Sequence, residues 1–178
     1  MSGDARQARL ERILASRTER LARPGERETG GEVVASIIQA TVGDEAVGLP
    51  VEWLREIVVR PAVAPLPGAP PWLPGLVQVR GRLMGVVDLA RFLGLRTPCR
   101  GTYVAIVETP PGPLGILLDD IRGFRTVTRE ELAERLEETA GGPGWPAVGT
   151  TRDLVTILDL EWLARDGRLV AGGGDAAR

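Results

Sequence analysis

Short apolar segments separated by turn-forming residues make up most of the chain after residue 33. Each is four to nine residues long and rich in Val, Ile and Leu, and Gly, Pro or Asp interrupts the pattern between most of them. Many short strands at this spacing are typical of a β-barrel or a β-sandwich. We therefore predict strands over 33–41, 46–49, 54–60, 76–79, 83–87, 102–108, 114–118, 123–128, 146–149 and 154–157.

A proline-rich stretch interrupts this series. Residues 61–74 contain six prolines, and proline cannot donate a hydrogen bond within a sheet. We expect the stretch to form an ordered loop or a sheet edge.

Helical patterns in the same region are short. Asp88 precedes an apolar turn that ends at Gly94, which is the pattern of an Asp N-cap and a Gly stop. Thr128 and Glu131 form a capping box, so we expect a helix behind them that carries Leu132 and Leu136. Asp159 is expected to cap another short helix.

Two of these capped helices repeat a pattern. Val-Val-Asp-Leu at 86–89 and Ile-Leu-Asp-Leu at 157–160 each join a strand to a helix, and Asp88 and Asp159 are 71 positions apart (159 minus 88). Such an echo suggests two related sub-barrels. Because the match is short, chance is the alternative interpretation.

The N-terminal region has a different pattern. Residues 1–23 predict an amphipathic helix with Leu10, Ile13, Leu14 and Leu21 near one face, and a linker follows Pro24. We favour a solvated helix resting on the body, with a partner-docking helix as the alternative. The expected division is a helical extension and linker over 1–32, one domain of two sub-barrels over 33–170, and a disordered tail over 171–178.

Composition narrows the possible functions. The chain has no histidine, one cysteine (Cys99) and a net charge of −2, and only 4% of its residues are aromatic. These values disfavour nucleic-acid binding and the usual catalytic bases and metal ligands. Asp119 and Asp120 are adjacent, so their side chains do not converge on one ion. We expect no enzyme activity, cofactor or metal, although a small all-β enzyme remains the least favoured alternative.

The chain begins without an apolar signal segment, and no apolar run is long enough to cross a bilayer. We expect a cytoplasmic protein without direct membrane insertion.

The most specific segment covers residues 73–89. It predicts a strand, a tight turn at Arg80-Gly81 and a returning strand that leads to Asp88. Alternation puts Val77 and Val79 on one face and leaves the Arg80 guanidinium at a strand end, available to a carboxylate or carbonyl. A partner-binding Arg80 and a structural Arg80 that ties the turn to the sheet are equally compatible with the spacing.

This segment resembles the CheW family of chemotaxis adaptors. The matching residues are Gly75, Arg80, Gly81, Val86, Asp88 and Leu89, and further matches occur at 54–57, 115–121 and 154–159. The likeness extends over about residues 33 to 166. Gln78 and Gly85 depart from the family pattern.

The resemblance implies a mainly β fold of two interlocked five-stranded SH3-like barrels with short helices. It also implies a non-catalytic scaffold that binds the cytoplasmic tip of a chemoreceptor and the regulatory domain of a CheA-type histidine kinase, recruited to membrane-associated receptor arrays. A related chemosensory system, for surface motility or development, is the alternative. By motif position, the residues implied in partner binding or its support are Glu56, Gly75 and Arg80, flanked by Leu54 and Ile57, and the structural motif residues are Gly81, Asp88 and Asp159.

Overall fold

The computed structural model describes residues 31–59, 61–110, 112–132 and 146–171. The N-terminal helix predicted over 1–23 and the tail after residue 171 lie outside these ranges. The strands are β1 (Val33–Val42), β2 (Glu45–Pro50), β3 (Leu54–Val59), β4 (Val63–Pro65), β5 (Gly75–Val79), β6 (Arg82–Val87), β7 (Tyr103–Thr109), β8 (Gly112–Leu118), β9 (Asp120–Thr128), β10 (Ala147–Thr150) and β11 (Thr156–Leu158). The helices are η1 (Val51–Trp53), α2 (Leu89–Leu93), η2 (Arg129–Glu131), α3 (Leu160–Arg165) and α4 (Gly167–Ala171).

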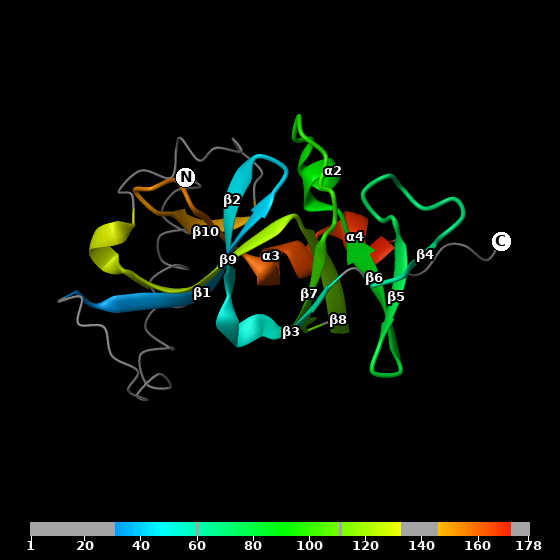
Figure 1. The fold of residues 1–178 in the computed structure, drawn as a ribbon, viewed down its shortest axis with the longest axis horizontal. Coiled ribbons are helices and arrows are strands. Elements are labelled where there is room, and N and C mark those ends of the chain that lie inside the picture. The colour runs from blue at the N-terminus through cyan, green and yellow to red at the C-terminus, as the bar shows by residue number, and fades with distance from the viewer. Residues whose placement is uncertain (1–30, 60, 111, 133–145, 172–178) are drawn as a thin grey trace.

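The strands form two curled sheets, which confirms the mainly β fold (Figure 1). Sheet A has the order β10-β11-β2-β1-β9, and sheet B has the order β3-β7-β8-β6-β5-β4. Five strands were expected in each barrel; sheet B has a sixth because part of the proline-rich stretch pairs with β5 as the edge strand β4. Proline is tolerated there because an edge strand leaves one side of its backbone unpaired.

The two sheets exchange strands. β1 and β2 form a hairpin in sheet A, but β3, only three residues further along, pairs with β7 in sheet B. In the same way β7 and β8 form a hairpin in sheet B, and β9 begins after Asp119 and pairs with β1 in sheet A. These two crossings are what interlocks the barrels.

The topology explains the sequence echo. Each half of the chain contributes a hairpin, a crossing strand, a second hairpin and an Asp-capped helix. In both halves the last strand pairs in parallel with a strand of the first hairpin of the other half, β6 with β8 and β11 with β2. The two sub-barrels are therefore related repeats.

The two aspartate caps have the same geometry. Asp88 accepts a hydrogen bond from the Arg91 amide at 3.1 Å, and Asp159 accepts one from the Trp162 amide at 2.8 Å. The Gly94 stop has φ of 69°, as the αL cap requires. Asp88 is buried, and this burial raises the pKa of its carboxyl.

The predicted capping box forms, but the helix behind it differs from the prediction. Thr128 and Glu131 exchange the two capping hydrogen bonds around the 3-10 helix η2. Leu132 is then extended and pairs with Thr151, so its backbone joins a β-bridge instead of a helix. Leu136 lies outside the described residues.

Three apolar clusters stabilise this arrangement. The sheet A core contains Val34, Ile37, Val127, Val155 and Ile157. The sheet B core contains Val77, Val79, Met84, Val86, Val104, Ile106 and Leu117. A larger central core lies between the sheets and takes residues from β1, β2, β6, β7, β8, β11, α2 and α3. The central core explains why neither sheet is an independent unit.

Asp119 stabilises the crossing from β8 to β9. Its carboxylate accepts hydrogen bonds from the amides of Gly43 (2.7 Å), Arg100 and Gly101 (3.3 Å), and its own amide donates to the Thr41 carbonyl at 2.8 Å. The neighbouring Asp120 is exposed and forms an ion pair with Arg122 at 3.3 Å. The two aspartates thus have different environments, as their adjacent positions predicted.

We expect Asp119→Ala to destabilise the protein by about 3 kcal/mol, because three backbone N–H groups lose their acceptor. The matched control Asp120→Ala should cost less than about 1 kcal/mol, since it removes only an exposed ion pair. Urea unfolding measures both changes in the free energy of unfolding. Equal losses in the two variants would show that Asp119 does not fasten the crossing.

Candidate functional site

The β5–β6 turn presents Arg80 to solvent. Val79 pairs with Arg82, which leaves Arg80 and Gly81 as a two-residue turn with φ angles of 49° and 78°. Positive φ at both positions is the type I′ geometry that matches the twist of a hairpin. Val77 and Val79 are buried in the sheet B core, as alternation predicted, and the Arg80 side chain is 77% exposed.

Arg80 pairs with Glu56 across the open side of sheet B. Its Nε lies 2.9 Å from Oε1 and 3.1 Å from Oε2 of Glu56. Glu56 is on β3 at one edge of the sheet, whereas Arg80 belongs to the β5–β6 hairpin near the other edge. The pair therefore closes the curl of the sheet over its core.

A second set of ion pairs extends this closure. Glu108 on β7 accepts hydrogen bonds from Arg82 at 2.7 Å and from Arg55. The Arg55 and Arg82 guanidinium groups hold the pKa of the Glu108 carboxyl below its usual range. We call these five residues the Arg80 seam: Arg55, Glu56, Arg80, Arg82 and Glu108.

Leu54 and Ile57 do not join the Arg80 seam. Both pack against the central core, on the opposite side of β3 from Glu56. The cause is a β-bulge: Leu54 pairs with Val107 and Glu56 with Ile106, which leaves Arg55 as an extra residue. The structure thus brings Glu56 together with Arg80 and places the two apolar residues behind them.

Gly75 has a steric role. It is buried with φ of 155°, and a Cβ built on it would lie 2.0 Å from the Ala64 carbonyl oxygen. Because β4 passes so close, no side chain fits at this position. Gly75 holds the edge strand beside the hairpin and offers no side chain to a partner.

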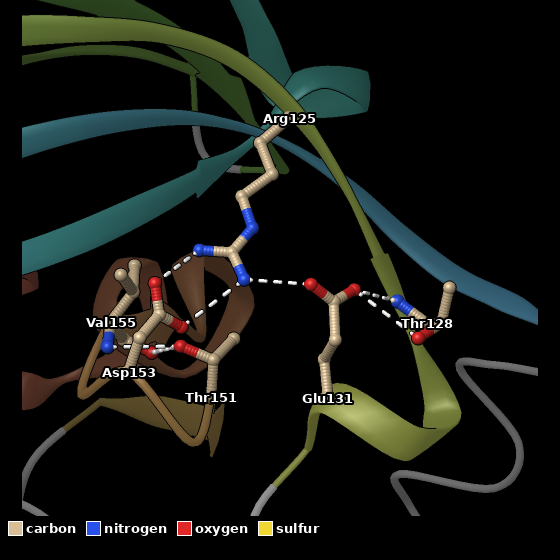
Figure 2. A network of polar contacts seen from close by, with 6 residues as sticks. All are labelled: Arg125, Thr128, Glu131, Thr151, Asp153 and Val155. Carbon is tan, nitrogen blue, oxygen red and sulfur yellow. Dashed lines mark hydrogen bonds and ion pairs between the residues drawn. The ribbon is translucent and has the colours of Figure 1, made fainter. Parts of the chain in front are cut away.

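A second polar network, which was not predicted from the sequence, lies at sheet A (Figure 2). Arg125 on β9 binds Asp153 through two hydrogen bonds of 2.6 and 3.1 Å, and its Nη2 also donates to Glu131 at 2.8 Å. The other Glu131 oxygen accepts from the Thr128 amide at 2.7 Å. We call Arg125, Asp153, Glu131 and Thr128 the Arg125 network.

The Arg125 network occupies the position in sheet A that the Arg80 seam occupies in sheet B. In both sheets a residue of an edge strand, β9 or β3, binds the turn of the second hairpin. The charges are exchanged, since Glu56 on β3 meets Arg80 and Arg125 on β9 meets Asp153. Asp153 lies 71 positions after Arg82 (153 minus 82), but Arg82 binds Glu108 on β7. The two networks therefore occupy similar places in their sheets without matching residue by residue, and the echo gives no direct signal for the Arg125 network.

Other candidate chemistry is weak in the described residues. The Cys99 thiol donates to Asp119, and burial, followed by smaller effects, raises its pKa to about 12, so it stays protonated at neutral pH. No group of three or more Cys, Asp or Glu side chains placed to hold a metal occurs among these residues. Within the same ranges, no helix is both long and apolar enough to cross a membrane.

Comparisons with known proteins agree with this geometry. Residues 36–168 match the family model described as CheW-like domain. The chain is 21% identical over 127 residues to chemotaxis protein CheW of Thermotoga maritima, covering 70% of this chain and 84% of that protein. It is 32% identical over 89 residues to protein PilI of Pseudomonas aeruginosa, covering 49% of this chain and half of that protein.

Two further similarities bear on fold and function. Protein FrzA of Myxococcus xanthus is 31% identical over 112 residues, with 57% of this chain and 62% of that protein covered. The crystal structure of the scaffolding protein TtCheW from Thermoanaerobacter tengcongensis superposes with a TM-score of 0.64 at 20% identity, covering 75% of this chain and 94% of that one. At this identity the superposition establishes the shared fold.

The Arg80 seam and the Arg125 network should differ in their contribution to stability. We expect Arg125→Met to lower the free energy of unfolding by about 2 kcal/mol at pH 7. The guanidinium makes three hydrogen bonds, and its removal leaves the Asp153 and Glu131 carboxylates without their cation. Arg80→Met should lower the free energy of unfolding by less than about 1 kcal/mol, since the Arg80 side chain is 77% exposed to water. Urea unfolding of both variants measures the difference, and equal losses would contradict it.

The Arg125 effect should also depend on pH. The Arg125 guanidinium holds the pKa of Asp153 below its usual range, and the Thr128 amide, followed by Arg125, does so for Glu131. A lowered folded-state pKa contributes stability that is complete above the unfolded value of about 4 and is lost as pH falls below it. The difference between native protein and Arg125→Met should therefore shrink in acid. If the difference in the free energy of unfolding between the two proteins stays constant down to pH 2, the Arg125 contribution comes from packing and not from its ion pairs.

Proposed function

The chain belongs to the family of CheW-like domains, and on that premise we propose that it is a scaffold coupling chemoreceptors to a CheA-type histidine kinase. The observation that carries the proposal is the Arg80 seam. Glu56 and Arg80 meet on an exposed surface, at the positions where the family resemblance implies partner binding. Relatives named as chemotaxis proteins support the same system.

The Arg80 seam is suited to recognition because only the Nε group of Arg80 is hydrogen-bonded to Glu56. Arg80 binds Glu56 through Nε, and its two Nη groups make no hydrogen bond within the described residues. These N–H groups can bind a carboxylate or a backbone carbonyl of a partner with little cost to the fold. Rim charges of this kind set register and partner choice more than they add affinity.

We assign the Arg80 seam to the receptor. A receptor tip is a helical hairpin, and an apolar helix face in a groove needs charged rim contacts to fix its register. Gly75 supports this surface by admitting β4 beside the hairpin, while Leu54 and Ile57 support it from the central core. Coupling then proceeds through contacts alone, without a covalent step or a cofactor, on the cytoplasmic side of the membrane at receptor arrays.

The same proposal includes the division of the chain. We infer an extension over 1–32, the coupling domain over 33–170 and a tail over 171–178, and the family match over 36–168 supports the inner boundaries. The second candidate is coupling in another chemosensory system, such as one for surface motility or development. Similarity to the proteins named PilI and FrzA supports this second candidate. The identity of the genes next to this one would decide between the two systems.

We expect Arg80→Glu to weaken binding of the receptor tip at least about tenfold while leaving the fold intact, because it reverses a rim charge on the partner surface. Repulsion between the new carboxylate and Glu56 should lower the melting temperature only slightly, since the site faces water. The measurement is calorimetric titration of the full chain with a receptor cytoplasmic fragment. Stimulation of the kinase in receptor-containing membranes should fall in parallel.

The matched control is Arg129→Glu. Arg129 also binds a carboxylate through Nε, that of Glu32 at 2.8 Å, and its side chain is 53% exposed. It belongs to η2, at the end of the molecule opposite the β5–β6 hairpin (Figure 1). If Arg80→Glu leaves receptor binding intact, or if Arg129→Glu weakens it equally, the Arg80 seam is not part of the receptor interface. A native chain that binds neither receptor nor kinase would contradict the whole proposal.

A further inference from the structure

An apolar row runs out of the central core across sheet A. Leu49 on β2, Ile38 on β1 and Phe124 on β9 lie directly opposite one another, so their side chains share one face of the sheet. Leu49 is fully buried, Ile38 is half-buried and Phe124 is 63% exposed. Packing within the described residues therefore covers this row at one end and leaves its aromatic end open.

The open end of the row belongs to a wider apolar surface. Ile121, also on β9, pairs with Ala40 and packs half-buried against the central core. Arg125, the residue after Phe124, points to the other side of β9, toward the β10–β11 turn (Figure 2). Scattered exposed apolar side chains are common, whereas one that continues a buried row marks a surface suited to docking. We call Ile38, Ile121 and Phe124 the β1–β9 ledge.

The chain enters the fold beside this ledge. The Glu32 carbonyl accepts a hydrogen bond from the Arg129 amide at 2.9 Å, just after β9 ends. Val33 then pairs with Thr128, the last residue of β9. Residues 1–30, which lie outside the described ranges, therefore join the body at the strand that carries the exposed aromatic ring.

The connecting segment is long enough to bring residues 1–23 onto the ledge. Phe124 is four positions before Thr128, a separation of about 13 Å along a strand. Residues 24–32 can span at most about 30 Å, and the glycines among them permit the chain to reverse. The helix predicted from the sequence can therefore fold back along β1 and β9.

Residues 1–23 also match the ledge in apolar pattern and in charge. Their predicted helix has one apolar face, and the stripe from Leu10 to Leu21 is about 17 Å long. These residues carry six arginines and three acids, a net charge of +3, whereas residues 24–178 carry 16 arginines (22 minus 6) and 21 acids (24 minus 3), a net charge of −5. A basic helix with an apolar stripe is complementary to an apolar ledge on an acidic body.

We propose that residues 1–23 form a helix that docks on the β1–β9 ledge of its own chain, with its apolar stripe over Ile38 and Phe124. The helix completes the apolar row that the described residues leave open. It is therefore a covering element of sheet A and does not serve as a separate docking helix for a partner. This inference concerns a contact within one chain and does not rest on the proposed function.

The short linker favours this occupant over a separate molecule. A segment tethered by a short flexible linker has an effective concentration of roughly millimolar at its site. A contact of modest area is then enough to keep the helix docked, since no translational freedom is lost when it binds. The ledge is small, which suits an intramolecular contact of this kind.

Hydrogen exchange of the full chain, measured by mass spectrometry on peptides from residues 9–22, tests the contact. We expect the amides of these residues to exchange at least about tenfold more slowly in the native protein than in the urea-unfolded chain, because docking stabilises their helical hydrogen bonds. Phe124→Thr should abolish most of this protection, since it removes the aromatic ring and keeps a residue that favours strands.

A variant on the other side of the contact should have the same effect. Replacing Ile13 and Leu14 together by alanine removes the centre of the apolar stripe and keeps a strong helix former at both positions. Combining this change with Phe124→Thr should speed exchange no further than either change alone, because both remove one interaction.

Leu83→Thr is the matched control. Leu83 is 63% exposed, the same fraction as Phe124, but it belongs to β6 in sheet B. This variant should leave exchange of residues 9–22 unchanged. Dilution of the native protein should also leave it unchanged, because a contact within one chain does not depend on protein concentration.

Three results overturn the inference. The first is exchange of residues 9–22 in the native protein as fast as in the unfolded chain. The second is protection that Phe124→Thr leaves intact or that Leu83→Thr reduces equally, which places the segment elsewhere. The third is protection that falls on dilution, which assigns the ledge to a second copy of the chain. Each result leaves the proposed function standing, because receptor and kinase binding are measured separately.

Discussion

The exchange of β3 and β9 between the sheets is the constraint on which the rest of the structure depends. Only η1 separates β2 from β3, and only Asp119 separates β8 from β9, so each strand must leave its hairpin and continue in the other sheet. Neither sheet can be completed without the other, and the space between them becomes the largest apolar core. Two five- or six-stranded sheets of this size would bury too little surface separately, which makes the shared core the source of cohesion.

The exchange also leaves one strand edge in each sheet that backbone pairing does not close. An ion pair bridges each edge, with the acid on β3 in sheet B and the arginine on β9 in sheet A. In each sheet the crossing strand becomes an edge, and the second hairpin reaches that edge through an ion pair. Arg80 is 77% exposed where it meets Glu56, and we expect this pair to contribute little to stability. Arg125 is 24% exposed, binds two carboxylates and meets the capping box of η2 through Glu131. One seam is therefore open to exchange its contacts with a partner, and the other fixes a turn.

Several elements followed from local pattern alone. Asp88 and Asp159 cap helices as expected, because an aspartate before an apolar turn satisfies the first free amides of a helix regardless of its surroundings. The positive φ of Gly81 and the edge position of β4 were predictable for the same local reason. The exit of Leu132 from the expected helix was not, because its pairing with Thr151 depends on a hairpin that lies further along the chain.

The sequence by itself determined most of the strands, the two aspartate caps and the Arg80 turn, since each depends on neighbours within a few positions. It suggested the repeat of 71 residues, which the topology of the two halves then established. Tertiary structure decided which side chains share a surface. The bulge at Arg55 turns Leu54 and Ile57 toward the central core and leaves Glu56 to meet Arg80, a pairing between residues 24 positions apart. It also decided that Arg125 would meet Asp153 and that Leu154 would be held in a left-handed turn. These contacts join edges of curled sheets, and strand alternation along the chain carries no information about which edges a curl brings together.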